Sequence, residues 1–134
     1  MVTETVVKEA LSKDLIDAGN RLTRLLDENR FDATASFWFF IVDSGVWRLI
    51  IASPNVDSDG IKGAYKKIQE ILSKPPHGDG SIHLKDITLL SPSDPLISLM
   101  KIGMRTGNGI SGIRFSKNLI NGVLIEDAYI YRLT

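Results

Sequence analysis

Two apolar runs joined by a short polar turn decide the fold of this chain: Ala35-Ser-Phe-Trp-Phe-Phe-Ile-Val42, Asp43-Ser-Gly45 and Val46-Trp-Arg-Leu-Ile-Ile-Ala-Ser53. Aromatic and β-branched residues of this kind are typical of strands. Gly45 stands where a type I turn followed by a bulge requires a positive φ. The stretch therefore predicts a β-hairpin.

The first strand of this hairpin is apolar on both of its faces. Alternation places Phe37 and Phe39 on one face and Trp38 and Phe40 on the other. A strand that is apolar on both sides must be covered on both sides. A helix layer covers one face, and we expect a second layer, a further helix or a partner chain to cover the other.

Hydrophobic periodicity on either side of the hairpin predicts the remaining elements. The predicted helices span residues 4–29, 60–73 and 94–105, and the predicted β-rich segments span residues 82–90 and 110–132. Thr3 or Thr5 is the expected N-cap of the first helix, and Gly19-Asn20 is expected to bend or split that helix. Asn121-Gly122 predicts a two-residue turn in the last segment, with Lys117-Asn118 as the competing turn.

The resulting order of elements is α-β-β-α-β-α-β-β. This order predicts a compact α+β domain over residues 1–134, with a mixed, mostly antiparallel sheet of about five strands and about three helices packed on it. A chain of 134 residues, 43% of them hydrophobic, is long enough to bury a core without disulfides.

Composition excludes several classes of protein. Lys and Arg number 16 against 16 Asp and Glu, so neither nucleic acid nor a membrane surface is the expected partner. No cysteine is present, which excludes a disulfide framework and a thiolate metal site. The longest apolar run, Phe37 to Val42, is far shorter than the ~20 residues of a membrane span. Acidic residues at the start stand where a secretory signal would carry basic residues, so we expect a cytoplasmic location. We also expect no cofactor.

Carboxylates in strand positions suggest one alternative function. A metal-dependent, nuclease-like hydrolase gathers acids and a lysine at strand ends around its ions. The candidate acids are Asp43, Asp86, Glu126 and Asp127. The second hairpin strand lacks the Glu-x-Lys pair of such enzymes and carries Arg48-Leu-Ile in its place.

A glycine-rich turn suggests a second alternative, an anion or small-ligand sensor over residues 105–112. Gly107, Gly109 and Gly112 have the spacing of a nucleotide-binding loop, but a helix precedes them and a strand follows, the reverse of the required order. Consecutive N–H groups around Asn108, with Arg105 beside them, would still form a nest for an anion.

Two further patterns are candidate metal sites. One is a small cluster of side chains that can bind metals, although nothing in their spacing fixes a site: His77, Asp79 and His83. The stretch from Asn55 to Gly60 has the acidic alternation of a calcium loop, but Lys66 occupies the position of the required bidentate glutamate. A helix cap is the simpler interpretation of that stretch.

The main functional hypothesis follows from the excess of apolar strand. Tyrosines and tryptophans on strands are typical of contact surfaces. The candidate interface residues are Trp38, Phe40, Trp47, Tyr129 and Tyr131. The sequence therefore predicts a non-enzymatic interaction or adaptor domain that forms a homo-oligomer, or binds another protein, through this aromatic surface.

Overall fold

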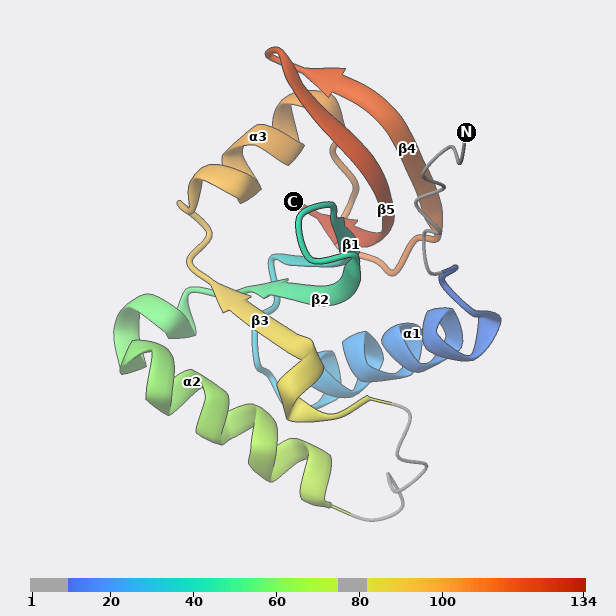
Figure 1. Ribbon diagram of the computed structural model, residues 1–134. Helices are drawn as coiled ribbons and strands as arrows, with labels where there is room; N and C mark the ends of the chain where they lie inside the picture. The colour runs from blue at the N-terminus through green and yellow to red at the C-terminus, as the bar shows by residue number, and fades with distance from the viewer. Residues whose placement is uncertain (1–9, 75–81) are drawn as a thin grey trace.

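The computed structural model describes residues 10–74 and 82–134. Within these residues, three α-helices, one 3₁₀ turn and five strands follow one another along the chain (Figure 1). The helices are α1 (Lys13–Glu28), α2 (Asn55–Ser73) and α3 (Pro95–Gly103), the 3₁₀ turn is η1 (Leu84–Asp86), and the strands are β1 (Ala35–Ile41), β2 (Val46–Ala52), β3 (Ile87–Leu90), β4 (Ile113–Ile120) and β5 (Val123–Leu133). The predicted α+β class and element order are confirmed.

The strands form a mixed sheet in the order β3-β2-β1-β5-β4. β2 and β3 run parallel, and the other neighbours run antiparallel. Both predicted turns are present, with φ of 69° at Gly45, 48° at Asn121 and 77° at Gly122. The competing turn at Lys117-Asn118 is wrong, because both residues lie inside β4.

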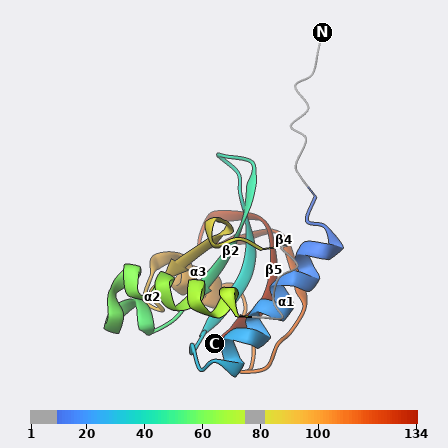
Figure 2. The same cartoon turned by 90° about the horizontal axis from the view of Figure 1, so that it is seen from below.

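Helices cover both faces of the sheet. α1 and α2 lie on one side, the side seen in Figure 2, and α3 lies on the other. One buried cluster joins residues of α1 and α2 to Trp38 and Leu49. A second cluster joins residues of α3 to Phe37 and Ile50. The chain therefore shelters both apolar faces of β1 with its own helices.

The described α1 begins at Lys13 rather than at residue 4. The Ser12 hydroxyl accepts a hydrogen bond from the Leu15 N–H at 3.2 Å, which satisfies a free N–H group of the first turn. The predicted caps Thr3 and Thr5 lie outside the described residues. The helix is capped where a short polar side chain stands directly before its first turn.

The predicted bend or split at Gly19-Asn20 is wrong, because α1 runs unbroken from Lys13 to Glu28. Gly19 instead lets two strand side chains reach the helix. Trp38 Nε1 donates to the Leu15 carbonyl at 3.1 Å, and the Tyr131 hydroxyl donates to the Ile16 carbonyl. A Cβ at position 19 would clash with Tyr131 Oη and lie 2.7 Å from Trp38 Nε1. Burial raises the pKa of the Tyr131 hydroxyl, so this group stays protonated and able to donate.

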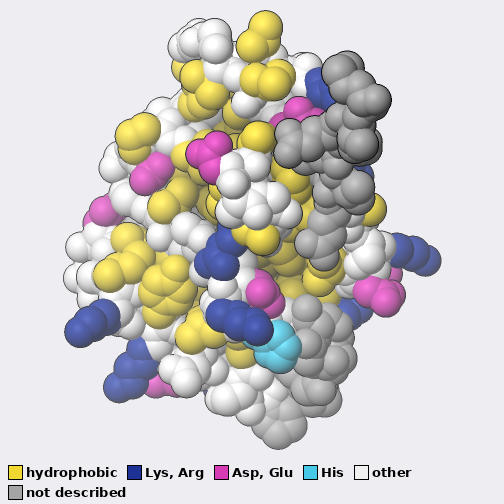
Figure 3. Space-filling view, viewed as in Figure 1, with side chains coloured by type: hydrophobic (Ala, Val, Ile, Leu, Met, Phe, Trp, Pro, Cys, Tyr) yellow, Lys and Arg dark blue, Asp and Glu magenta, His cyan; other side chains and the backbone are white. Residues whose placement is uncertain are grey.

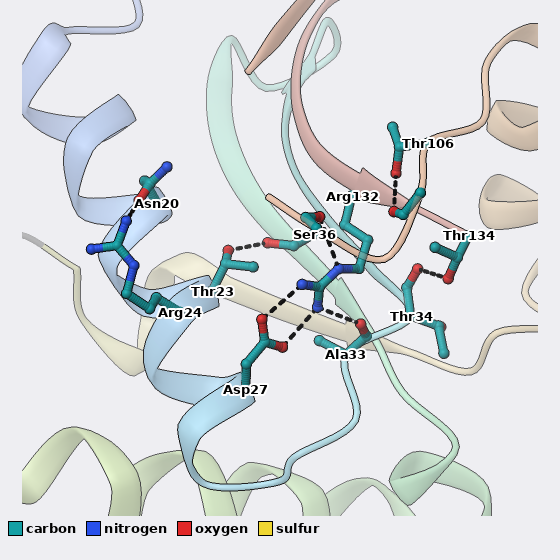
Figure 4. A network of polar contacts seen from close by, with 12 residues as sticks. Asn20, Thr23, Arg24, Asp27, Ala33, Thr34, Ser36, Thr106, Arg132 and Thr134 are labelled. Carbon is teal, nitrogen blue, oxygen red and sulfur yellow. Dashed lines mark hydrogen bonds and ion pairs between the residues drawn. The ribbon is translucent and has the colours of Figure 1, made fainter. Parts of the chain in front are cut away.

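A buried guanidinium fastens α1 to the sheet (Figure 4). Arg132 of β5 is 6% exposed. Its Nη1 and Nη2 donate to the two carboxylate oxygens of Asp27 at 2.8 and 2.7 Å, and Nη1 also donates to the Ala33 carbonyl at 3.0 Å. Hydrogen bonding to Asp27 raises the pKa of Arg132 more than burial lowers it, so the pair remains charged.

The free edge of β3 is closed by a side chain from α2. The Tyr65 hydroxyl donates to the Ile87 carbonyl and accepts from the Leu89 N–H, both at 3.1 Å. Backbone groups of this kind otherwise allow an edge strand to pair with another chain. Tyr65 therefore protects this edge while packing against the core.

We expect Tyr65→Phe to lower the free energy of unfolding by about 1 kcal/mol, because the partly buried Leu89 N–H loses its hydrogen-bond partner, while the Ile87 carbonyl still accepts from Arg48 Nη2 at 3.0 Å. Urea titration measures this loss. The matched control is Tyr129→Phe, since the Tyr129 hydroxyl makes no hydrogen bond to any residue in the described ranges. Equal losses in the two variants would show that the edge contact adds no stability.

Candidate interaction surface

The tip of the β4–β5 hairpin exposes large apolar side chains. Residues 118–125, Asn-Leu-Ile-Asn-Gly-Val-Leu-Ile, contain no charged residue. Leu119 and Leu124 face each other in the strand register and are 71% and 53% exposed. Val123 is 47% exposed. Exposed hairpins usually carry charges, so an apolar tip requires a separate explanation.

A local change in backbone conformation turns Leu119 outward. Phe115 and Ile120 are both buried in the cluster under α3, although their positions differ by an odd number. In a regular strand such residues point to opposite faces. Lys117 has a φ of 50°, which interrupts the alternation between Phe115 and Ile120. Leu119 then points away from the core rather than into it.

The end of α3 adds a further apolar side chain at the same end of the molecule. A Cβ at Gly103 would lie 2.5 Å from Ile120 Cδ1, so the helix end packs directly against the hairpin. Its neighbour Ile102 is 61% exposed. Figure 3 shows apolar side chains gathered at this end. Leu119 and Leu124 lie on the face of the hairpin away from α3, whereas Val123 shares the α3 side with its partner Ile120. Together these side chains surround the tip, and we call this set the hairpin-tip surface: Ile102, Leu119, Val123 and Leu124.

The aromatic residues predicted to form the interface lie in the core instead. Trp38, Phe40, Trp47 and Tyr131 are between 1% (Tyr131) and 8% (Trp47) exposed. Tyr129 is half-buried and packs against the same cluster. The prediction that they form a contact surface is wrong, because α1 and α2 already cover their face of the sheet.

Asp127, one of the predicted hydrolase acids, accepts hydrogen bonds from side chains of the neighbouring strand β4. Arg114 donates through Nε and Nη2 to its two oxygens at 2.6 and 2.5 Å, and the Ser116 hydroxyl donates at 2.6 Å. Asp127 raises the pKa of Arg114 chiefly through these hydrogen bonds. The Arg114 guanidinium also stacks over Trp47 at 5.7 Å. This buried carboxylate therefore holds β4 against β5.

The predicted hydrolase acids do not converge. Asp43 is exposed in the turn after β1, while Asp86 precedes β3 at the edge of the sheet. β2 and β1 separate β3 from the strand that carries Glu126 and Asp127, a distance of roughly 14 Å at ~4.8 Å per strand spacing. Within the described ranges, no three His, Asp or Glu side chains lie close enough to hold a metal ion. The predicted acidic cluster is wrong.

The glycine-rich turn is not an anion nest in this structure. Its predicted ligands are exposed: Arg105, Gly107, Asn108 and Gly109. Residues 105–112 contain no left-handed residue of the kind that builds a nest. The segment runs along the end of β5, where the Thr106 N–H donates to the Leu133 carbonyl at 2.9 Å. The predicted nest is therefore wrong, and the segment acts as a connection that extends the sheet.

The other candidate metal residues do not form a described site. His77 and Asp79 lie outside the described residues, and His83 is exposed beside η1. Asn55 belongs to the first turn of α2, and Asp59 pairs with Lys67 at 2.6 Å. The calcium-like stretch therefore lies inside α2. The simpler interpretation, a side-chain cap for a helix, is also wrong, because the N-cap is Pro54 and no side chain of the stretch caps the helix.

Among the helices in the described part of the chain, none combines the length and apolarity needed to cross a bilayer. Comparisons with protein-family models, curated proteins and solved structures found no match for this chain.

Proposed function

We propose that this protein is a small non-enzymatic interaction domain that associates with a second copy of itself through the hairpin-tip surface. The observation that carries the proposal is the exposure of Leu119 and Leu124, two large apolar side chains side by side on a hairpin with no charge between residues 118 and 125. Covering them with another apolar surface removes them from water, which is the main favourable term in protein association.

The charges of the chain favour a second copy as the partner. The 16 cationic and 16 anionic side chains balance, so two copies approach without net repulsion. Tip-to-tip contact also buries no charged residue of the turn, and so avoids the desolvation penalty of an unpaired charge.

The size of the surface sets the strength of the contact. Exposed apolar patches on monomers reach roughly 300–600 Å², below the ~800 Å² per partner of a stable complex. We therefore expect a reversible dimer with a dissociation constant in the micromolar range or weaker, and not a permanent one.

Leu119→Lys tests the proposal. Because the side chain is 71% exposed, a lysine there fits the folded chain, while in a dimer it would be buried without a partner. We expect the wild type to show concentration-dependent association by sedimentation equilibrium and Leu119→Lys to remain monomeric at the same concentrations.

Val42→Lys is the matched control, since Val42 is 62% exposed at the tip of the other hairpin, β1–β2. This variant adds the same charge and is expected to associate like the wild type. A wild type that stays monomeric up to about 1 mM, or an equal loss of association in both lysine variants, would contradict the proposal.

A further inference from the structure

A surface hollow of about 250 Å³ lies between the end of α1 and the second half of α2. Asn29 and Arg30 line it from the turn after α1. Lys67, Glu70 and Lys74 line it from α2, where their spacing of three and four residues places them on one helix face. This hollow is separate from the hairpin-tip surface and shares no residue with it.

The hollow carries an excess of positive charge. Its lining holds three cations, Arg30, Lys67 and Lys74, against one carboxylate, Glu70. Lys67 pairs with Asp59, and Lys74 Nζ lies 3.4 Å from the Asn29 side-chain oxygen. The Arg30 guanidinium has no hydrogen-bond or ion-pair partner among residues 10–74 and 82–134. The free guanidinium and the loosely held Lys74 are available to an anion.

The backbone of Arg30 gives an independent reason to assign this side chain a role. Its N–H donates to the Asp27 carbonyl at 3.1 Å, and the Phe31 N–H donates to the Leu26 carbonyl at 2.9 Å. These bonds form the Schellman motif that ends many helices, in which the residue in the position of Arg30 is usually glycine. Arg30 has a φ of 56°, where a Cβ costs free energy that glycine avoids.

Such strain is concentrated at functional sites. No contact within the described residues explains why an arginine stands where glycine fits better.

We propose that the hollow binds a phosphate group, either as inorganic phosphate or as a small phosphate monoester, with Arg30 as its main contact. The guanidinium offers a rigid fork of N–H donors that matches two oxygens of a tetrahedral oxyanion. Lys74 and Lys67 add charge on the facing helix. The volume lies below the ~300–1,000 Å³ of pockets for drug-sized ligands, which restricts the site to small ligands.

Arg30→Gly separates binding from folding. We expect the variant to melt about 3 °C higher than the wild type without ligand, because it relieves the left-handed strain. We also expect it to bind phosphate about tenfold more weakly or worse, because it loses a bidentate charge-assisted contact. Binding is measured by NMR titration of the backbone amides of residues 29–31 with inorganic phosphate, at constant ionic strength.

A parallel titration with glycerol phosphate distinguishes the two sources of the group. Tighter binding of the ester identifies a phosphate monoester as the ligand, and equal or weaker binding identifies free phosphate.

Two matched variants complete the test. Arg105→Gln removes an exposed cation from the glycine-rich turn and is expected to leave the dissociation constant unchanged. Asp32→Gly relieves a second left-handed residue, with a φ of 60°, and is expected to raise the melting temperature without altering binding. The proposal is overturned if Arg30→Gly binds phosphate like the wild type. It is equally overturned if the wild-type amides show no saturable shift up to about 50 mM phosphate.

Discussion

Asp27→Ala is expected to lower the free energy of unfolding by about 3 kcal/mol, the lower end of the range for breaking a buried ion pair. The variant leaves the Arg132 guanidinium inside the protein without its carboxylate. Hydrogen bonds to the Ala33 and Gly109 carbonyls remain, and the Asp27 side chain is 39% exposed, which together keep the loss from being larger. Urea-induced unfolding followed by tryptophan fluorescence measures the change.

The control for this variant is Glu28→Ala, which removes a carboxylate from the adjacent position. Glu28 is exposed and makes no ion pair with any described residue, so its removal should change stability by less than about 0.5 kcal/mol. The double variant Asp27→Leu with Arg132→Met should recover most of the loss, since an apolar pair avoids the desolvation penalty. If Asp27→Ala is as stable as Glu28→Ala, the pair does not hold α1 to the sheet.

Gly19→Ala is expected to cost about 2 kcal/mol, within the range found for overpacked cores. The added methyl group would meet Tyr131 Oη and Trp38 Nε1, both of which are fixed by hydrogen bonds to α1. In an exposed helix the same substitution would instead stabilise the chain by about 1 kcal/mol, because alanine is the better helix former. The sign of the change therefore distinguishes close packing from helix propensity.

Gly107→Ala is the matched control for Gly19→Ala. No described atom lies within 4 Å of a Cβ at that position, and its φ is not positive. We expect no more than about 0.5 kcal/mol of change for this surface position. Stabilisation by Gly19→Ala would show that α1 has room to move away from the strands.

Local signals in the sequence predict most of the fold. The turn glycines, Gly45 and Gly122, and the aromatic run of β1 identify the two hairpins, because their conformational requirements depend on neighbouring residues alone. The start of α1 is predicted less well, since periodicity continues through residues that precede the Ser12 cap.

The same local signals do not locate the functional surfaces. Periodicity shows that the segment of α3 is apolar on one face, but not that this face covers Phe37. Periodicity alone therefore predicts that the aromatic strand needs a partner. The uncharged run at residues 118–125 is visible in the sequence, but regular alternation points Leu119 inward. Lys117 adopts a left-handed conformation that shifts this alternation by one residue and turns Leu119 outward. A lysine in the sequence does not indicate a positive φ, because non-glycine residues seldom adopt one. The left-handed conformation of Arg30 could not be predicted for the same reason.

The position of β5 in the sheet has a consequence for the synthesis of the protein. β5 lies between β1 and β4, and it supplies Tyr131 and Arg132, which fasten the sheet to α1. While the ribosome is still translating residues before 123, β1 has a neighbour on one side alone and the anchors of α1 have not been made. The aromatic residues of β1 therefore remain incompletely buried in the nascent chain until translation passes residue 133. During that interval they are available to chaperones that bind apolar segments.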